Sequence, residues 1–465
     1  MPSFQQKQKL VCLLVVLSLG AAVRSSGQTA PKSEFISLTA AQPVLSGMSN
    51  SIPGDLKAVG RLDDAKWSTW VQAKDREVRD RLDRGTEDTL TNLLRFGVTF
   101  TKEYRIDDEY LVRYGQSSLV NGFAENRAND LIHALASPQA SEGIVEMRIF
   151  LEKRGFSFNT PLERARVKKY LLDNLARLRD EFLKYRGQTK DEKRFQLFQD
   201  RGISLDTNLW PDYALDVQLR SMAEKGLLKP GSVRRIAIVG PGLDFANKEA
   251  GSDFYPPQTI QPFAVLDSLF RLGVADPAKV ELYTMDISQE VNVHIDRARK
   301  NATRGRSYIV QLPWNTERPM SDDYRANFIA YWNHLGDRSG EPVSPISVPS
   351  AAAGIKTRAV KIRPGIVERI TPLDMNIVYQ RLAIGPDQAF DMVVGTNIFL
   401  YYGEFEQSLA RANVAAMLKP GGYLLSNDKL PDTVPSGLSD VLETPITSSV
   451  EPLVRDVMFC YKRAN

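Results

Sequence analysis

Short apolar runs alternate with amphipathic stretches from about residue 228 to the end of the chain. The first run, Ile236 to Val239, holds four consecutive apolar residues, which is typical of a strand buried on both faces of a parallel sheet. Such alternation predicts an α/β fold with a Rossmann-like, doubly wound sheet. The expected strands are 236–239, 280–285, 308–312, 377–382, 392–394, 423–425 and 457–461, and the expected helices are 259–272, 288–304 and 404–418.

The preceding stretch has the periodicity of helices instead. The clearest helix begins at Thr160-Pro161-Leu162-Glu163, where Thr160 and Glu163 form a capping box and Pro161 occupies the first helical position. The charged helices of this stretch carry many carboxylates. We interpret these as side chains on solvated helix faces, because no catalytic constellation stands out. From position alone, the stretch Leu205 to Tyr213 is expected to pass near the active site.

Composition and pattern together divide the chain into four parts. Residues 1–30 resemble a signal segment, and residues 31–55, rich in Ser, Pro, Gly and Ala, are expected to form a linker. Residues 56–227 form the helical domain. Residues 228–465 form the α/β domain, with an insertion at about 307–374.

The first residues have the layout of a secretory signal peptide. Lys7 and Lys9 precede an apolar run from Leu10 to Val23, which is too short for a comfortable membrane span. Arg24 follows the run directly, and no clean cleavage site of two small residues stands out. The alternatives are an uncleaved anchor, which would be the protein's one contact with a membrane, and a true start at Met48.

Overall composition excludes several function classes. The 465 residues are 43% hydrophobic and 25% charged, as in ordinary globular proteins. The net charge of +4 is spread over helices of mixed sign, so no nucleic-acid partner is expected. Two cysteines and three histidines lie far apart in the sequence, and no metal site is expected from them.

The candidate chemistry begins where the first strand ends. Gly240-Pro241-Gly242 allows the backbone to turn sharply and to approach a ligand closely, although a tight strand-to-helix turn explains a lone Gly-x-Gly equally well. Asp286 closes the second strand, where a carboxylate can accept hydrogen bonds from both hydroxyls of a ribose. The alternative for Asp286 is a cap for the helix near Ser288.

In this order and spacing, the features resemble the class I S-adenosylmethionine-dependent methyltransferases over about half of the chain. The resemblance rests on the glycine turn, Asp286, the fourth strand Phe390 to Val394, and the stretch Leu418 to Leu425 with its Lys-Pro-Gly-Gly. The stretch Thr396 to Tyr402 is similar to the chemotaxis-receptor type, in which an Asn and then a Tyr-aromatic pair follow the fourth strand.

The resemblance implies S-adenosylmethionine as the cofactor and assigns roles to particular positions. Asn397 would lie beside the sulfonium, and Asn397, Tyr401 and Tyr402 would form the transfer site. Arg381 and Leu382, at the carboxyl end of the assumed third strand, would contact adenine. The implied cofactor-binding residues are Gly240, Gly242, Asp244, Gln258, Asp286, Ile287, Arg381, Leu382 and Asn397.

The sequence departs from the family pattern at the glycine turn. An acidic residue often precedes the glycines, but Ile238 and Val239 stand here, and Asp244 replaces the third glycine. Asp244 would contact the methionine end of the cofactor or cap the turn. The long loop that follows is expected to place Tyr255 and Gln258 against the cofactor or substrate.

We therefore expect methyl transfer to an acceptor that the sequence does not name; a protein carboxylate and a small molecule both remain open. The insertion and the helical domain would cover the pocket, or the insertion's aromatic residues would simply pack it onto the sheet. An NAD-dependent oxidoreductase shares the glycine turn but not the later pattern. A non-catalytic binding module is the other alternative. An export-like segment conflicts with a donor made in the cytoplasm, which leaves localisation open.

Overall fold

The computed structural model describes residues 31–185, 198, 202–244, 253–352, 354–432, 437–447 and 455–464. The signal-like segment 1–30 therefore lies outside the described residues. Residues Lys32–Asn465 form one compact unit, so the boundary near residue 228 is a change of secondary structure within that unit. In the described part of the chain, no helix has the length and apolar character needed to cross a membrane.

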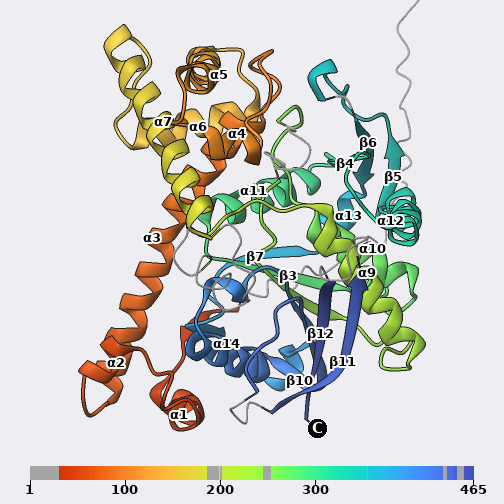
Figure 1. Cartoon of the computed structure of the whole chain (residues 1–465). Helices are drawn as coiled ribbons and strands as arrows, with labels where there is room; N and C mark the ends of the chain where they lie inside the picture. The colour runs from red at the N-terminus through yellow and green to blue at the C-terminus, as the bar shows by residue number, and fades with distance from the viewer. Residues whose placement is uncertain are drawn as a thin grey trace, which may run out of the picture. The chain divides into compact units, whose positions relative to one another are not determined.

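A seven-stranded sheet lies at the centre of this unit, in the order β11-β12-β10-β9-β2-β3-β7 (Figure 1). All neighbouring pairs are parallel except those made by β12, which runs antiparallel to β10 and β11. This is the Rossmann-like, mostly parallel sheet that the sequence predicts. The strands are β2 (Arg235–Val239), β3 (Glu281–Asp286), β7 (Ile370–Asp374), β9 (Phe390–Gly395), β10 (Leu418–Ser426), β11 (Leu438–Thr447) and β12 (Arg455–Arg463).

Helices cover both faces of this sheet because β2 is apolar on both sides. Ile236 and Ile238 belong to one core cluster, whereas Ala237 and Val239, which alternate with them, belong to another. The first cluster includes residues of α9 (Leu209–Glu224), α10 (Gln261–Arg271) and α11 (Gln289–Ala302). The second includes residues of α1 (Leu38–Gly47), α3 (Asp64–Phe96) and α14 (Glu404–Met417).

The prediction of the third strand at 377–382 is wrong. The strand beside β3 is β7, with Leu282 paired to Ile370 and Asp286 to Asp374. Residues Gln380–Leu382 form β8, which pairs antiparallel with β1 (Ser33–Phe35) in a separate two-stranded sheet. A search for apolar runs does not find β7, because this strand contains Pro372 and polar residues. Proline is tolerated there because β7 lies at the edge of the sheet.

The expected linker at 31–55 is also corrected, because much of it forms packed structure. Ser37 caps α1, whose Ala41 and Val44 are buried. The Trp67 indole donates a 2.8 Å hydrogen bond to the Ile36 carbonyl. A short helix, α2 (Gly54–Ala58), crosses the predicted boundary. These residues are small and polar in composition, but their few apolar side chains find partners on α3 and α14.

The long helix α3 joins the helical region to the sheet (Figure 1). Near its start, Trp70 packs against Tyr379 and Phe405 of the sheet region. Toward its end, Leu90 and Leu93 share a core cluster with residues of α5 and α7. The predicted capping box of α7 is confirmed, since Thr160 and Glu163 bond each other's backbone N–H. The other helices here are α4 (Asp108–Arg113), α5 (Ser118–Ala136), α6 (Glu142–Lys153) and α7 (Pro161–Tyr185).

The predicted insertion at about 307–374 forms a three-stranded antiparallel sheet, in the order β4-β6-β5, with α12 against it. Its predicted end is too late, because Ile370–Asp374 is β7 of the central sheet. The expected strand 308–312 lies here and not in the central sheet. Trp314 packs on Phe328, and Trp332 donates to the Leu312 carbonyl, so these aromatic residues hold the insertion together. Its elements are β4 (Tyr308–Asn315), α12 (Asp322–His334), β5 (Gly340–Val343), β6 (Ile355–Ile362) and α13 (Pro364–Val367).

Candidate functional site

A cavity lies at the carboxyl ends of β2, β3, β7 and β9 and is partly open to solvent; its empty space, with open solvent included, is about 780 Å³. That is the edge where open α/β sheets bind ligands. Residues from the segment before α9 and from α3 complete the wall. The lining residues are Leu82, Ile203–Thr207, Pro211, Val239, Gly240, Gly242, Gln261, Met285–Ile287, Met375–Ile377, Thr396–Ile398, Tyr401 and Tyr402.

The glycine turn forms one side of this cavity, and its geometry requires glycine. Gly240 and Gly242 have φ of 63° and 67°, in the left-handed region that L side chains avoid. A Cβ at Gly240 would lie 2.1 Å from Ile398 Cδ1, and one at Gly242 would lie 2.6 Å from the Leu205 carbonyl oxygen. The turn therefore presents bare backbone where a side chain would close the space.

Asp286 and Ile287 both line the cavity at the end of β3. Asp286 Oδ1 accepts a 2.7 Å hydrogen bond from the Ser288 N–H. Burial raises the pKa of Asp286 to about 7, although hydrogen bonds to the carboxylate oppose the shift. The cap of α11 is the Ser288 side chain, which accepts from Val291 N–H. The alternative role for Asp286 as that cap is therefore filled by Ser288.

The α3 helix clamps the ends of β3 and β7 beside Asp286. Arg79 pairs with Asp374 at 2.7 Å and with Asp75 at 3.0 Å, and it donates to the Ile287 carbonyl. Asp75 in turn accepts a 2.9 Å hydrogen bond from the Asn376 side chain. Apart from Asp75 and Arg79, which are four residues apart on α3, the partners come from distant parts of the chain, so no sequence motif indicates this arrangement.

Both predicted adenine-contacting residues lie outside the cavity wall. Arg381 pairs with Glu34 of β1 at 3.3 Å, and the Leu382 side chain is buried in the core. The cause is the wrong assignment of the third strand, since the residues that follow the true strand β7 are Met375, Asn376 and Ile377, and these do line the cavity.

Asp244 and Gln258 do not line the cavity either, and nor does Tyr255. The Tyr255 hydroxyl donates to Asp244 Oδ1 at 2.8 Å, and Gln258 Nε2 donates to Asp244 Oδ2 at 3.1 Å. Gln258 also bonds the backbone of Gln311 in β4, and all three side chains are buried. Burial raises the pKa of Asp244 to about 7. The network closes the long loop at its base and joins it to the insertion.

The turn after β9 brings Thr396, Asn397 and Ile398 into the wall. Asn397 has φ of 58°, and no other non-glycine residue in the described ranges has a positive φ. Its N–H donates to Asn427 Oδ1 at 2.8 Å, and Asn427 Nδ2 donates to Asn397 Oδ1 at 2.7 Å. Such locally strained backbone is held by its surroundings and is concentrated at functional sites.

Tyr401 and Tyr402 follow at the short 3-10 turn η3 (Phe399–Tyr401), and both line the cavity. The Tyr401 hydroxyl accepts a 3.4 Å hydrogen bond from the Ser204 N–H, and Arg81 donates to the Tyr401 carbonyl. Burial raises the pKa of Tyr402 well above its usual value, so this phenol stays protonated and is a hydrogen-bond donor rather than a base.

The wall segment before α9 contains the residues that sequence patterns missed. The Leu243 N–H donates to the Leu205 carbonyl at 2.8 Å, which ties this segment to the glycine turn. Leu205, Asp206, Thr207 and Pro211 line the cavity, in agreement with the position-based expectation for this stretch. Its aromatic residues are not part of the cavity wall: Trp210 and Tyr213 pack against α12.

Behind this wall lies Asp212, whose side chain is buried, with no hydrogen-bond partner for either oxygen among the described residues. Burial raises its pKa to about 8. The neighbouring Gln261 lines the cavity and donates to Thr396 Oγ1 at 2.8 Å. A search of the described part of the chain for three or more clustered His, Cys, Asp or Glu side chains that could hold a metal ion finds none.

Comparisons with known proteins give matches of structure alone. No protein-family model matches the sequence, and no curated protein matches it. The N-methyltransferase NodS from Bradyrhizobium japonicum is similar at 10% identity, over 59% of this chain and 100% of NodS, with a TM-score of 0.27. Magnesium protoporphyrin IX methyltransferase from Synechocystis, with bound S-adenosylmethionine, is similar at 11% identity, over 61% and 97% of the two chains, with a TM-score of 0.26.

The glycopeptide N-methyltransferase MtfA is similar at 12% identity, over 54% of this chain and 94% of MtfA, with a TM-score of 0.26. Likenesses of this size carry no argument about chemistry.

Proposed function

We propose that this chain binds S-adenosylmethionine in the cavity and transfers its methyl group to an acceptor. One observation carries the proposal: the left-handed Gly240-Pro241-Gly242 turn and the Asp286 carboxylate end adjacent parallel strands and line one cavity. A bare-backbone turn next to a carboxylate is the arrangement that holds a nucleoside-like ligand in α/β sheets.

The residues around the cavity suggest how such a ligand would lie. Asp286 would accept from the ribose hydroxyls, because a carboxylate offers several acceptor positions beyond the one used by Ser288. The adenine would lie among Met375, Asn376 and Ile377 beyond it. The amino-acid end would then reach the glycine turn and the segment 203–207.

The cofactor, when bound, supplies an electrophilic methyl group on a positively charged sulfur. The residues of this chain would contribute position and shielding from water, which can supply much of the rate of a transfer reaction. Asn397, Tyr401 and Tyr402 stand at the end of β9, where the methyl group would lie. Tyr402 would act as a donor that orients the acceptor, since its phenol stays protonated.

The acceptor itself stays unidentified. The similarity to the chemotaxis-receptor type rests on the stretch Thr396 to Tyr402 alone. A non-catalytic cofactor-binding module has the same cavity, so binding and turnover need separate measurements.

Calorimetric titration of the full chain tests the binding half of the proposal. S-adenosylmethionine and S-adenosylhomocysteine should bind with micromolar affinity, and NAD should not. Asp286→Asn should weaken both adenosyl ligands by about tenfold or more, the loss expected for hydrogen bonds to a charged group. Asp267→Asn is the matched control, because Asp267 is a buried carboxylate outside the cavity that accepts from the backbone N–H groups of Arg338 and Ser339. Absence of binding by either adenosyl ligand would refute the proposal.

A further inference from the structure

Two carboxylates line the described wall of the cavity, and they come from different segments of the chain. Asp286 ends β3, whereas Asp206 lies in the segment before α9. In the described ranges, no Lys, Arg or His side chain lines the cavity. The described wall therefore favours a ligand with a positive charge.

Asp206 is held against the glycine turn by its sequence neighbours. The Leu205 carbonyl accepts from Leu243 N–H, and a Cβ on Gly242 would lie 3.3 Å from Thr207 Cβ. Because Asp206 lies between Leu205 and Thr207 in the sequence and lines the cavity, these contacts place it next to the glycine turn.

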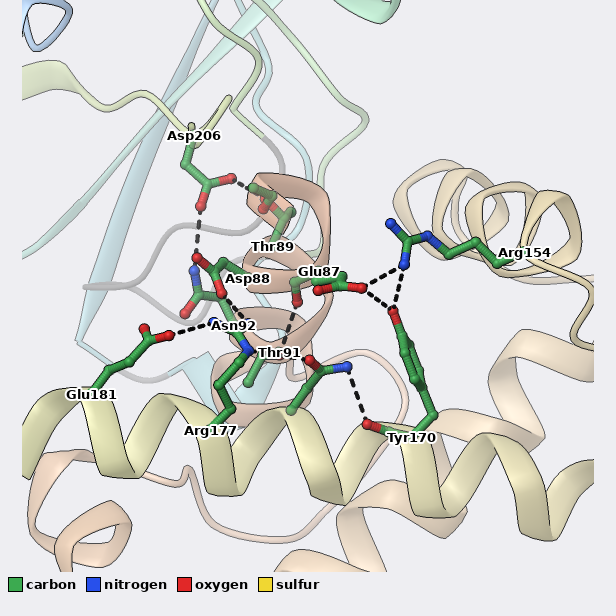
Figure 2. A network of polar contacts seen from close by, with 12 residues as sticks. Glu87, Asp88, Thr89, Thr91, Asn92, Arg154, Tyr170, Arg177, Glu181 and Asp206 are labelled. Carbon is green, nitrogen blue, oxygen red and sulfur yellow. Dashed lines mark hydrogen bonds and ion pairs between the residues drawn. The ribbon is translucent and has the colours of Figure 1, made fainter. Parts of the chain in front are cut away.

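The helical region orients this carboxylate. Thr89 Oγ1 and Asn92 Nδ2, on α3, donate to its two oxygens at 3.3 and 3.4 Å (Figure 2). Two flanking contacts fix the same turn of α3: Arg177 of α7 pairs with Asp88 at 2.5 Å, and the Tyr170 hydroxyl donates to Glu87 at 2.7 Å.

We propose that Asp206 binds the ammonium group on the amino-acid end of the cofactor. The inference rests on the proposed function and specifies one contact within it. With the ribose at Asp286 and adenine beyond it, the amino-acid end would extend to the glycine turn, where Asp206 is the second described carboxylate that lines the cavity. A charge-assisted hydrogen bond from an ammonium to a carboxylate is strong and directional. Asp206 would thereby supply the carboxylate that the end of β2 lacks, since Ile238 and Val239 are apolar and buried.

The proposal also gives the helical region a function. Thr89 and Asn92 are 117 and 114 residues from Asp206 in the sequence, and they hold its carboxylate through α3. The helices would thus act as positioning elements of the cofactor site.

Two ligands that differ in the amino-acid end test the inference. S-adenosylhomocysteine carries the ammonium, whereas 5′-methylthioadenosine keeps adenine, ribose and sulfur without it. Asp206→Asn should weaken binding of S-adenosylhomocysteine by about 10- to 100-fold, the range for losing a charged hydrogen bond. Binding of 5′-methylthioadenosine should change less than about twofold, because that ligand has no group for the carboxylate to bind. Asp286→Asn, the control, should weaken both ligands equally.

The outcomes separate the two proposals. If the unaltered chain binds neither ligand, the cofactor proposal fails and this inference fails with it. If both ligands bind and Asp206→Asn leaves their affinity ratio unchanged, whether by no loss or by an equal loss, the assignment of Asp206 is overturned and the cofactor proposal stands. Asn92→Leu keeps the carboxylate but removes one donor to it. This variant should lower the affinity for S-adenosylhomocysteine relative to that for 5′-methylthioadenosine, as Asp206→Asn does, but by a smaller factor.

Discussion

Replacing Asp212 by Asn should stabilise the protein, and the gain should grow with pH. Among the described residues, no group meets hydrogen-bond geometry with the buried Asp212 carboxyl oxygens. Burial raises the pKa of Asp212 from 3.8 to about 8, and the Gln261 side chain opposes the rise in part. Above pH 4 the unfolded chain releases this proton while the folded chain keeps it. The folded state then binds more protons than the unfolded state, so stability falls as pH rises until the group ionises in the fold near pH 8.

The size of the effect follows from the same two values. Each pH unit between them costs about 1.4 kcal/mol of stability, which amounts to about 4 kcal/mol at pH 7. Asn has the shape of the protonated acid but no proton to release. Its amide is also a buried polar group, and that cost does not vary with pH. The best measure is therefore the difference between the two proteins in how steeply the free energy of unfolding changes with pH.

Urea unfolding of both proteins at several values between pH 5 and pH 8 measures this slope. The free energy of unfolding of the Asn variant minus that of the parent should rise by about 1.4 kcal/mol per pH unit. Asp216→Asn, one turn along α9, is the control. Asp216 pairs with Arg271 and accepts from Ser268, so its replacement should destabilise the fold throughout. A pH-independent difference for Asp212→Asn would refute the argument, because it would mean that the carboxyl is already ionised in the fold.

Two further substitutions test the glycine turn and a buried histidine. Gly240→Ala should lower the free energy of unfolding by several kcal/mol more than Gly226→Ala, because both glycines have positive φ but only Gly240 faces Ile398. Equal losses of stability in thermal unfolding would contradict this. Burial and then Arg297 lower the pKa of His294 from 6.5 to about 4, so the folded protein should lose about 3 kcal/mol as pH falls across that range. His294→Gln should flatten this loss in urea titrations, and an unchanged pH profile would count against it.

Features that lie at strand ends could be predicted from the sequence. A buried apolar run fixes where a parallel strand stops, and the carboxyl ends of such strands meet at one edge. Gly240, Gly242, Asp286 and Asn397 therefore lie around one cavity as expected, together with Tyr401 and Tyr402.

The rest of the site depends on contacts between distant segments. Asp206 meets Thr89, and Arg79 meets Asp374, through folding of α3 against the sheet. No local pattern encodes such pairs. The prediction for Arg381 is wrong because Pro372 makes the true third strand, β7, hard to find from its sequence. The prediction for Asp244 is wrong because the two ends of the long loop pair with each other, at Asp244 and Gln258, instead of lining the cavity.

A crystal structure of the full chain grown with S-adenosylhomocysteine tests the central claim most directly. The account predicts that the ribose hydroxyls lie within hydrogen-bond distance of Asp286, that adenine lies beside Met375 to Ile377, and that the amino-acid end lies at Gly240 to Gly242. An empty cavity at millimolar ligand, or ligand bound elsewhere on the chain, would contradict it.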